Sequence, residues 1–236
     1  MPDRGKLIEF DTLTSTSDWL ALNAPQLIDP TWVRATSQTA GHGRHGRPWQ
    51  SPPGNLAASV LIRARPGEGP PQQLSFVAAL ALSDAVSPWA GRLRLSLKWP
   101  NDLVLAGGKV AGILLEQNGD ATIIGFGVNL AHAPKGVDQR TAALTLATPH
   151  PPRPAALLED LRSAFATWRD RWRREGFAPI RTAWQSRATP VGWRTSVKRG
   201  SETLAGAFAG LADDGAMLLK RDGRTETIHA GEVLGL

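Results

Sequence analysis

The hydrophobic residues of this chain repeat with two different periods, and these periods predict which segments are strands and which are helices. Leu93, Leu95 and Leu97 alternate with polar residues, which is typical of a half-buried strand. The apolar run 56–62 lies between proline and glycine residues and predicts a buried central strand. The run 74–86 is longer and rich in alanine and leucine, so it predicts a buried helix. Three further strands are predicted over 7–10, 32–38 and 123–130.

A hairpin is predicted around the two adjacent glycines at 107–108, because apolar runs flank them on both sides. Pro100 ends the preceding strand and places Asn101 and Asp102 at a turn. Lys109 then begins the returning strand. We therefore expect Lys109 to lie on the same rim as Asn101 and Asp102.

Two more helices are indicated by residues that favour helix ends. The hydroxyl and carboxyl side chains of 14–18 can cap a short helix beginning near Trp19. The proline-rich connector 148–154 opens a longer helix, which we expect to end at Gly176. The apolar face of this longer helix is formed by Leu157, Leu161, Phe165, Trp168 and Trp172.

The pattern changes near the C-terminus. From Gly192 onward, short apolar segments are separated by glycines and by Asp-Gly pairs at 214–215 and 222–223, which predicts a small all-β unit. The chain is therefore expected to have an α+β fold. A mixed sheet with packed helices would occupy residues 1–188, and a small β-barrel would occupy residues 189–236.

Composition narrows the classes of function. The absence of cysteine excludes disulfides, thiolate metal sites and cysteine nucleophiles. No signal peptide and no apolar stretch long enough to span a bilayer are apparent, so we expect a cytoplasmic protein without membrane contact. The formal charge of +6 raises the question of nucleic acid, but no nucleic-acid-binding motif is evident. The excess charge can equally serve anionic substrates and an acidic protein partner.

Three polar stretches carry the candidate chemistry. Residues 41–49 read GHGRHGRPW, a glycine-rich cationic segment that we call the flap and that suits an anionic small molecule. Residues 98–102 read KWPND, with Lys109 shortly downstream, and residues 125–129 read GFGVN. Taken alone, the flap is a solvated basic loop and Asn129 is equally a turn asparagine. The order and spacing of the three stretches distinguish this chain.

These stretches resemble those of the biotin protein ligases, which activate biotin with ATP and attach it to a lysine of a carrier protein. That family has a glycine- and arginine-rich loop ending in tryptophan, a Lys-Trp-Pro-Asn-Asp segment followed by a lysine, and a Gly-x-Asn near the end of its core. In this chain His42 and His45 stand where arginines are usual. His42 leaves the flap with one fixed positive charge fewer, and we expect this flap to be pH-sensitive. The resemblance also implies an SH3-like C-terminal domain.

The resemblance implies specific ligand contacts. Residues 15–17 match a triplet that binds the ureido ring of biotin in the family, although these hydroxyls can equally be a helix N-cap. The biotin-binding residues implied are Ser15, Thr16, Ser17, Gln38, Gly41, His42, Gly43, Arg44, Lys109 and Gly112. The ATP-binding residues implied are Arg44, Arg47, Trp49, Asn101, Lys109 and Asn129. The catalytic residues implied are Arg44, Lys109 and Asp102.

ATP, Mg²⁺ and the substrate biotin are the small molecules implied, with no direct protein ligand to the metal identified. A biotin carboxyl carrier protein is the implied partner, and the sequence leaves the choice between monomer and homodimer open. The alternative function is a lipoate or octanoate protein ligase of the same fold, against which the intact flap and the C-terminal β-unit argue. A DNA-binding regulator is disfavoured, since the flap begins only about forty residues from Met1, which leaves no room for an N-terminal winged helix.

Overall fold

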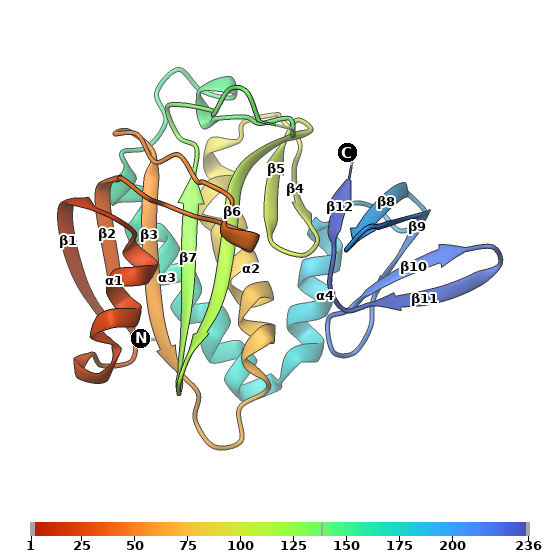
Figure 1. The fold of residues 1–236 in the computed structure, drawn as a ribbon, viewed down its shortest axis with the longest axis horizontal. Helices are drawn as coiled ribbons and strands as arrows, with labels where there is room; N and C mark the ends of the chain where they lie inside the picture. The colour runs from red at the N-terminus through yellow and green to blue at the C-terminus, as the bar shows by residue number, and fades with distance from the viewer. Residues whose placement is uncertain (1–2, 138, 235–236) are drawn as a thin grey trace.

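The strands form one mixed sheet and one antiparallel sheet (Figure 1). The computed structural model describes residues 3–137 and 139–234, and within these the large sheet has the order β1-β2-β3-β7-β6-β5-β4 and the small sheet the order β11-β10-β9-β8-β12. Among these strands only β1 and β2 pair in parallel; the other neighbouring strands of both sheets are antiparallel.

The large sheet contains β1 (Lys6–Leu13), β2 (Thr31–Gln38), β3 (Leu56–Arg63), β4 (Leu95–Lys98), β5 (Asp102–Leu105), β6 (Gly108–Asn118) and β7 (Ala121–Val128). The small sheet contains β8 (Arg194–Arg199), β9 (Glu202–Leu211), β10 (Met217–Arg221), β11 (Arg224–Ile228) and β12 (Glu232–Leu234). The helices are α1 (Thr16–Asn23), α2 (Leu74–Val86), α3 (Pro154–Glu175) and α4 (Phe177–Arg187). Single 3₁₀ turns are η1 (Ala24–Gln26), η2 (Arg44–Gly46), η3 (Pro71–Gln73), η4 (Ser87–Trp89) and η5 (Leu144–Leu146).

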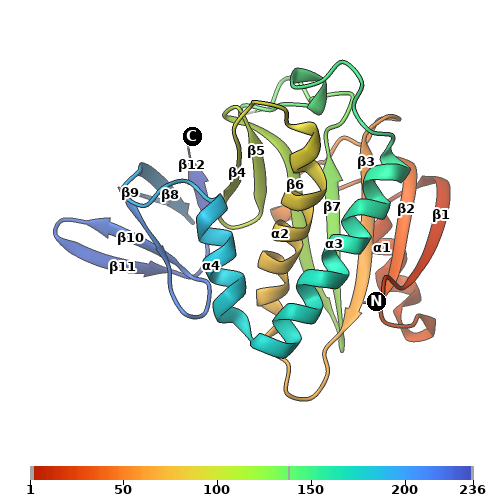
Figure 2. The ribbon, with the colours of Figure 1, turned by 180° about the vertical axis from the view of Figure 1, so that it is seen from behind.

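The helices divide unequally between the two faces of the large sheet. Helices α2, α3 and α4 cover the rear face (Figure 2), whereas the short α1 lies on the front face against β3 and β7. The front face beyond α1, over β6 and β7, is therefore not covered by a helix. The functional site lies there.

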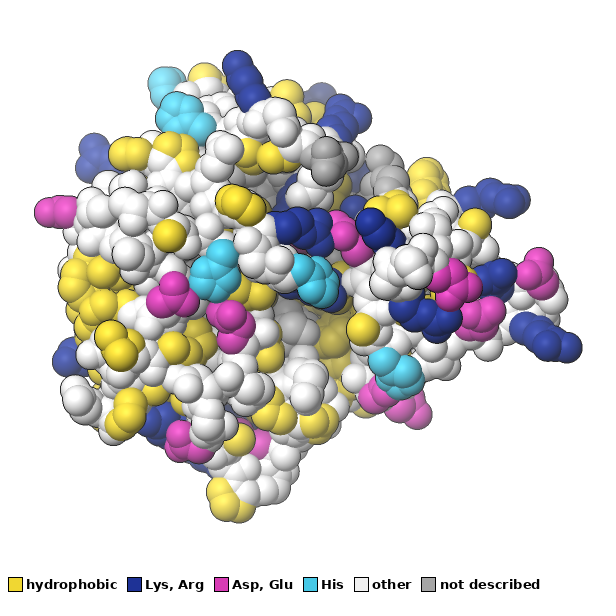
Figure 3. Space-filling model, in the orientation of Figure 1, with side chains coloured by type: hydrophobic (Ala, Val, Ile, Leu, Met, Phe, Trp, Pro, Cys, Tyr) yellow, Lys and Arg dark blue, Asp and Glu magenta, His cyan; other side chains and the backbone are white. Residues whose placement is uncertain are grey.

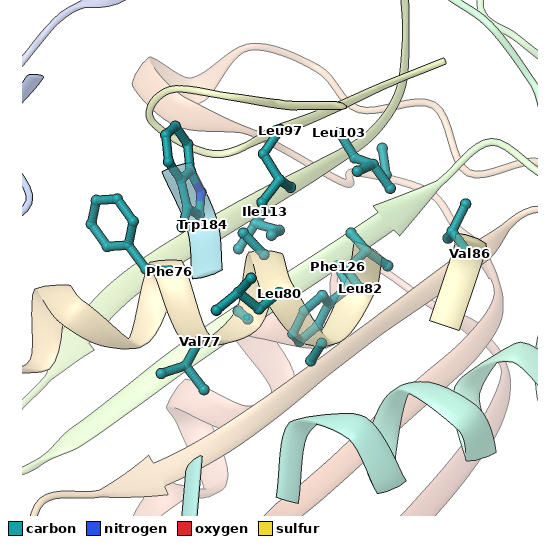
Figure 4. Close-up of a cluster of buried hydrophobic side chains, with 14 of the residues drawn as sticks. Phe76, Val77, Leu80, Leu82, Val86, Leu97, Leu103, Ile113, Phe126 and Trp184 are labelled. Carbon is teal, nitrogen blue, oxygen red and sulfur yellow. The ribbon is translucent and has the colours of Figure 1, made fainter. Parts of the chain in front are cut away.

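The main core fills the space between α2 and the rear of the large sheet (Figure 4). Leu80 of α2 is fully buried, and it points toward side chains of the sheet such as Ile113 and Phe126. Phe76 packs edge-to-face on Trp184 of α4, with ring centroids 5.6 Å apart. These contacts bury an apolar face that extends almost all the way around α2, which explains why its sequence shows little helical periodicity.

The elements with strong patterns are confirmed. The helix predicted at 74–86 has these bounds as α2, and the central strand predicted at 56–62 is β3, fully buried along most of its length. The predicted hairpin is formed by β5 and β6, with Ala106 and Gly107 at its turn. Both turn residues have positive φ, 48° and 81°, which is the conformation of the two central residues of a type I′ turn.

Other predictions were incomplete. The strand predicted at 7–10 is longer, and Leu93 lies before β4 rather than within it. Helix α4 had not been predicted, since Gly176 indicated only the end of the preceding helix. Pro179 lies in the first turn of α4, where the backbone N–H groups have no intrahelical partner and proline is tolerated.

The small β-barrel expected at the C-terminus is not closed. In the described part of the chain the five strands form an open antiparallel sheet, with β11 at one edge and β12 at the other. Within the described residues, β12 (Glu232–Leu234) pairs with β8.

The two sheets share one hydrophobic core. The buried cluster that contains α2 also contains Val197, Phe208 and Met217 of the small sheet. The indole nitrogen of Trp99 donates a hydrogen bond to the carbonyl of Gly215, 3.2 Å away. Because this packing is continuous, the division of the chain at residue 188 stays a prediction.

None of the helices in residues 3–137 and 139–234 is both long and apolar enough to cross a membrane. The longest, α3, carries arginine and acidic residues along its length.

The core predicts how two leucine truncations will differ. Leu80→Ala should lower the free energy of unfolding by about 2–5 kcal/mol, because it opens a cavity in the core of α2. Leu22→Ala is the matched control: Leu22 is also helical but is 82% exposed, and its truncation should change stability by no more than about 0.5 kcal/mol. Denaturant titration of both variants measures the difference, and equal losses would contradict this description of the core.

Candidate active site

A cleft of about 740 Å³ opens on the front face between the large sheet, the flap and the small sheet. Figure 3 shows this hollow, with basic, acidic and histidine side chains near its rim. Strands β6 and β7 form its floor, and the flap crosses in front of them. The small sheet contributes Lys198, Glu232 and Val233 to the wall.

The floor of the cleft is kept open by glycine. Gly112 of β6 and Gly127 of β7 are register partners. A Cβ atom at Gly127 would lie 2.2 Å from the indole of Trp49, so only glycine permits this ring to lie on the floor. The ring of Trp49 also approaches Gly112, where a Cβ atom would lie 3.3 Å from it.

One end of the cleft is a network of hydroxyl and amide groups. Thr16 donates its backbone N–H (2.8 Å) and its hydroxyl (3.0 Å) to the side-chain oxygen of Gln38. Ser59 of β3 is within hydrogen-bond distance of the hydroxyls of Thr16 (2.7 Å) and Ser17 (3.0 Å). Ser15 caps α1 by accepting a hydrogen bond from the N–H of Asp18 (3.2 Å), as an N-cap does. This end can therefore offer donors and acceptors in fixed positions.

The middle of the cleft is cationic. The ammonium of Lys109 lies 2.7 Å from a carboxylate oxygen of Asp102, and both side chains are mostly buried. The register between β5 and β6 shifts at Leu103 and Val104, so Lys109 faces Val104 directly and shares its side of the sheet with Asp102. The predicted proximity of Lys109 and Asp102 is confirmed.

Lys98 at the end of β4 adds a second ammonium to the cleft. Burial lowers the pKa of Lys98, and the positive charge of Lys109 lowers it further, whereas the carboxylate of Asp102 opposes both effects. The two ammonium groups of Lys98 and Lys109 and the carboxylate of Asp102 therefore form one cluster with a net positive charge.

The flap is folded back on itself. The N–H of Gly43 donates to the carbonyl of Arg47 (2.8 Å), and the N–H of Trp49 donates to the carbonyl of Gly41 (2.8 Å). His45 at the tip has a φ of 58°, in the left-handed region that histidine adopts more readily than most residues. The arginines and Trp49 are thereby presented toward the cleft.

The flap is also bound to the small sheet. Arg47 forms a bidentate ion pair with Glu232, both N–O distances being 2.8 Å, and Arg44 donates to the carbonyl of Gly231 (3.0 Å). The hydrogen bonds between Arg47 and Glu232 raise the pKa of Arg47 and lower the pKa of Glu232. Because Glu232 holds Arg47 through two oxygens, its carboxylate occupies the fork that a phosphate or carboxylate ligand would use.

His42 lies between two acidic side chains. Its Nε2 is 3.6 Å from an oxygen of Glu116 and 3.9 Å from an oxygen of Asp18. A protonated His42 would be attracted to both carboxylates.

Thirteen of the fifteen predicted site residues line the cleft. They are Ser15, Thr16, Ser17, Gln38, His42, Gly43, Arg44, Arg47, Trp49, Asn101, Asp102, Lys109 and Gly112. Asn101 is held in place by hydrogen bonds with the backbone of Ile113 in both directions.

The remaining two predicted site residues, Gly41 and Asn129, lie behind the residues that line the cleft. A Cβ at Gly41 would lie 2.6 Å from the amide nitrogen of Gln38 and 2.8 Å from the carbonyl of Trp49, so Gly41 permits close packing at the base of the flap. Asn129 is 1% exposed and donates to the carbonyls of Ala142 (3.1 Å) and Lys109 (3.4 Å). It therefore positions the backbone of Lys109 from behind, and its side-chain oxygen has no hydrogen-bond partner in the described residues.

Several cleft residues had not been predicted: Ser59, Lys98, Arg140, Lys198 and Glu232. Ser59 had a signal, since it is a hydroxyl inside an otherwise apolar strand. Lys98 is the first residue of the KWPND stretch. No sequence pattern marked Glu232 or Lys198 as a cleft residue, because only the packing of the small sheet brings them to the cleft.

Family models and known proteins match this chain. The model of the Biotin/lipoate A/B protein ligase family matches residues 7–132, and that of the Biotin protein ligase C terminal domain matches residues 192–234. The Biotin--[acetyl-CoA-carboxylase] ligase of Paracoccus denitrificans is 43% identical over 89% of this chain and 92% of its own length. The protein of the same name from Mycobacterium tuberculosis is 33% identical over 89% of this chain and 80% of its own length.

A solved structure, the biotin protein ligase from Aquifex aeolicus in complex with biotin and ATP, superposes with a TM-score of 0.85. It is 27% identical in sequence, and the match covers 97% of each chain.

The ion pair between Arg47 and Glu232 predicts the mobility of the flap. Glu232→Gln should increase tryptic cleavage at the Arg44–His45 bond about two- to fivefold in the ligand-free protein, because a partly exposed pair of this kind contributes up to about 1 kcal/mol. Gel or mass-spectrometric time courses measure the rate. Glu226→Gln is the matched control, since Glu226 belongs to the same sheet but contacts Arg221 instead. Identical cleavage of all three proteins would mean that the pair does not hold the flap.

Proposed function

The chain belongs to the biotin/lipoate A/B protein ligase family, and on this premise we propose that it activates biotin with ATP and transfers the biotinoyl group to a lysine of a biotin carboxyl carrier protein. The observation that carries the proposal is the position of Lys109 and Asp102. They lie in the middle of a cleft that has a polar network at one end and flap arginines at its mouth.

Both substrates are anions, so their reacting groups approach each other only if positive charge is supplied. In the first step a carboxylate oxygen of biotin attacks the α-phosphorus of ATP, the bond to the β-phosphate oxygen breaks, and pyrophosphate leaves. Lys109 and Arg44 are the proposed catalytic cations. A fixed ammonium at this point stabilises the charge that develops on the phosphate oxygens.

The product of this step is a mixed anhydride that water hydrolyses. A flap that closes over the cleft answers this problem, because it excludes water from the intermediate. Trp49 already lies on the glycine floor, and the flap already spans the mouth to the small sheet. The flap thus needs only a local rearrangement to cover a ligand.

In the second step the amine of the carrier lysine attacks the carbonyl carbon of the anhydride, an amide bond forms, and AMP leaves with its phosphate. The attacking amine must lose a proton. Asp102 is the proposed acceptor and orienting group for this amine. Lys109 then neutralises the carbonyl oxygen and the departing phosphate.

The binding roles follow from the two ends of the cleft. The hydroxyls of Thr16 and Ser17 with the amide of Gln38 suit the ureido ring of biotin, which needs both donors and acceptors. His42, Gly43 and Gly112 would flank the biotin chain. The ATP-binding residues proposed are Arg44, Arg47, Trp49, Asn101, Lys109 and Asn129, of which Asn129 would act from behind the wall.

Mg²⁺ is proposed to enter with the phosphates of ATP. The carboxylates that line the cleft are Asp102 and Glu232, and each is paired with a cation. No group of three or more potential ligands occurs in the described residues. Such a site suits an ion that is held chiefly by substrate phosphates and water, with one carboxylate at most. Bound there, the ion would supply further charge neutralisation.

Biotin is favoured over lipoate or octanoate because residues 192–234 match the C-terminal domain of biotin protein ligases. The carrier is proposed to be a biotin carboxyl carrier protein or domain, and the enzyme is proposed to act in the cytoplasm without nucleic acid or membrane. A monomer and a homodimer remain equally compatible with the described surface.

The purified protein should release pyrophosphate when given biotin and MgATP, with no nucleic acid present. Coupled measurement of pyrophosphate tests this, and mass spectrometry identifies biotinoyl-AMP. Lipoate under the same conditions is the comparison. Activation of lipoate without activation of biotin would contradict the proposed function.

Lys109 should be the most sensitive position. Lys109→Ala should slow pyrophosphate release about a hundredfold or more, because a fixed charge that acts mainly in the transition state is lost. Affinity for biotin should fall much less, since the ring contacts Thr16 and Ser17. Lys135→Ala, at an exposed lysine on the next loop, should leave the rate unchanged. Rapid-quench measurement of pyrophosphate decides the assignment, and near-normal release by Lys109→Ala would overturn it.

A further inference from the structure

A serine interrupts the apolar run of the central strand β3. Ser59 is the one polar residue among residues 56–62, and it is 0% exposed. A hydroxyl buried in this way is costly unless it forms hydrogen bonds. Strand β3 lies against α1 (Figure 1), where Ser59 meets the hydroxyls of Thr16 (2.7 Å) and Ser17 (3.0 Å). Because its own surface is covered, Ser59 can act on a ligand only through these two hydroxyls.

The direction of these hydrogen bonds follows from the amide of Gln38. The backbone N–H of Thr16 can only donate, so the Gln38 atom that lies 2.8 Å from it is the side-chain oxygen, Oε1. This oxygen can only accept, so the hydroxyl of Thr16, 3.0 Å away, donates its hydrogen to Oε1. The amide nitrogen of Gln38 donates to Ser51 (2.9 Å), which agrees with this orientation.

Each hydroxyl carries a single hydrogen, so the rest of the network has only one direction. Since the hydrogen of Thr16 is donated to Gln38, Ser59 must be the donor in its contact with Thr16. The hydrogen of Ser59 is then used, so Ser17 must be the donor in its contact with Ser59. The hydrogens therefore point along one chain, from Ser17 through Ser59 and Thr16 to Gln38.

This direction decides what the polar end of the cleft offers to a ligand. Ser17 and Thr16 line the cleft with oxygens whose hydrogens are already donated, so both oxygens can only accept. Ser15 differs, because it accepts from the N–H of Asp18 (3.2 Å) and that bond leaves its own hydrogen to donate. Gly125 keeps the space beside Ser17 open, since a Cβ atom there would lie 3.0 Å from the hydroxyl oxygen.

On the basis of the proposed function, we propose that Ser59 is a positioning residue that makes Thr16 and Ser17 acceptors for the ring N–H groups of biotin. A cyclic urea has two N–H donors and one carbonyl acceptor, which two acceptors and the donor Ser15 match. Without Ser59, the hydroxyl of Ser17 loses the acceptor that directs its hydrogen. That hydrogen can then turn toward a ring N–H, and two donors that face each other form no hydrogen bond.

Steady-state measurement of pyrophosphate release tests this role. Ser59→Ala should raise the KM for biotin about fivefold, the effect of one net hydrogen bond. The KM for ATP and the kcat at saturating biotin should stay at their wild-type values, because Lys109 is unchanged. Thr122→Val is the matched control and should leave all three constants unchanged. Thr122 is likewise a buried hydroxyl of the large sheet, but its partner is Gln117 (2.9 Å).

Ring analogues separate a role through the N–H groups from a general loss of packing. The probes are the two cyclic carbamates of biotin in which an oxygen replaces one or the other ring N–H. In calorimetric titration, the wild type should bind at least one carbamate about fivefold more weakly than biotin. Ser59→Ala should bind that carbamate and biotin equally. Ser59→Cys is the second variant, because a thiol occupies the site but hydrogen-bonds only weakly, and it should show the same changes.

The outcomes distinguish the role of Ser59 from the proposed function. An unchanged KM for biotin in both Ser59 variants, or a carbamate-to-biotin ratio equal to that of the wild type, overturns the role of Ser59 alone. A similar rise in the KM for biotin and for ATP would mean that Ser59 only supports the fold, which also overturns it. A wild type that binds lipoate but not biotin overturns the proposed function and this role together, since the ring of lipoate has no N–H group.

Discussion

Two ammonium groups, those of Lys98 and Lys109, lie close together in the centre of the cleft. The carboxylates around them are placed so that they reduce the repulsion between these two charges. Lys98 and Lys109 are close enough for the charge of one to lower the pKa of the other. Asp102 offsets this repulsion from β5, where the bulged register with β6 fixes it 2.7 Å from Lys109. Without this carboxylate the two ammonium groups would repel each other in a half-buried site. The cleft thus keeps a net positive charge that its fold tolerates and that anionic substrates can neutralise.

The same constraint gives the small sheet its place in the site. A second carboxylate, Glu232 of β12, lines the cleft and pairs with Arg47 of the flap. It can lie there because the small sheet shares a core with the large one and accepts the hydrogen bond of Trp99 through Gly215. Trp99 lies between Lys98 and Asp102 along the chain. The segment that supplies the cleft with charge is therefore also the segment that anchors the second sheet.

The sequence allowed the local parts of this arrangement to be predicted. The pattern of apolar residues was sufficient to predict α2 and β3. The glycines at 107–108 were sufficient to predict the hairpin that brings Lys109 beside Asp102. Interactions between distant segments could not be predicted. Glu232 is 185 residues from Arg47, and no local pattern marks it as a partner. The open shape of the small sheet likewise could not be predicted, because turn residues do not determine which strands lie at its two edges.

The strength of the contact between flap and small sheet sets how the cleft can open and close. Arg47 and Glu232 are about half and one-third exposed, and pairs of this kind contribute at most about 1 kcal/mol. Charge-assisted hydrogen bonds from the same guanidinium to a less exposed phosphate contribute about 1.5–3 kcal/mol. An incoming phosphate can therefore compete with Glu232 for Arg47. A much stronger ion pair would hold Arg47 away from any ligand, and without the pair the flap would open more often between reactions. The bidentate but exposed pair lies between these limits, so it favours the flap over the cleft and still leaves Arg47 available to an anion.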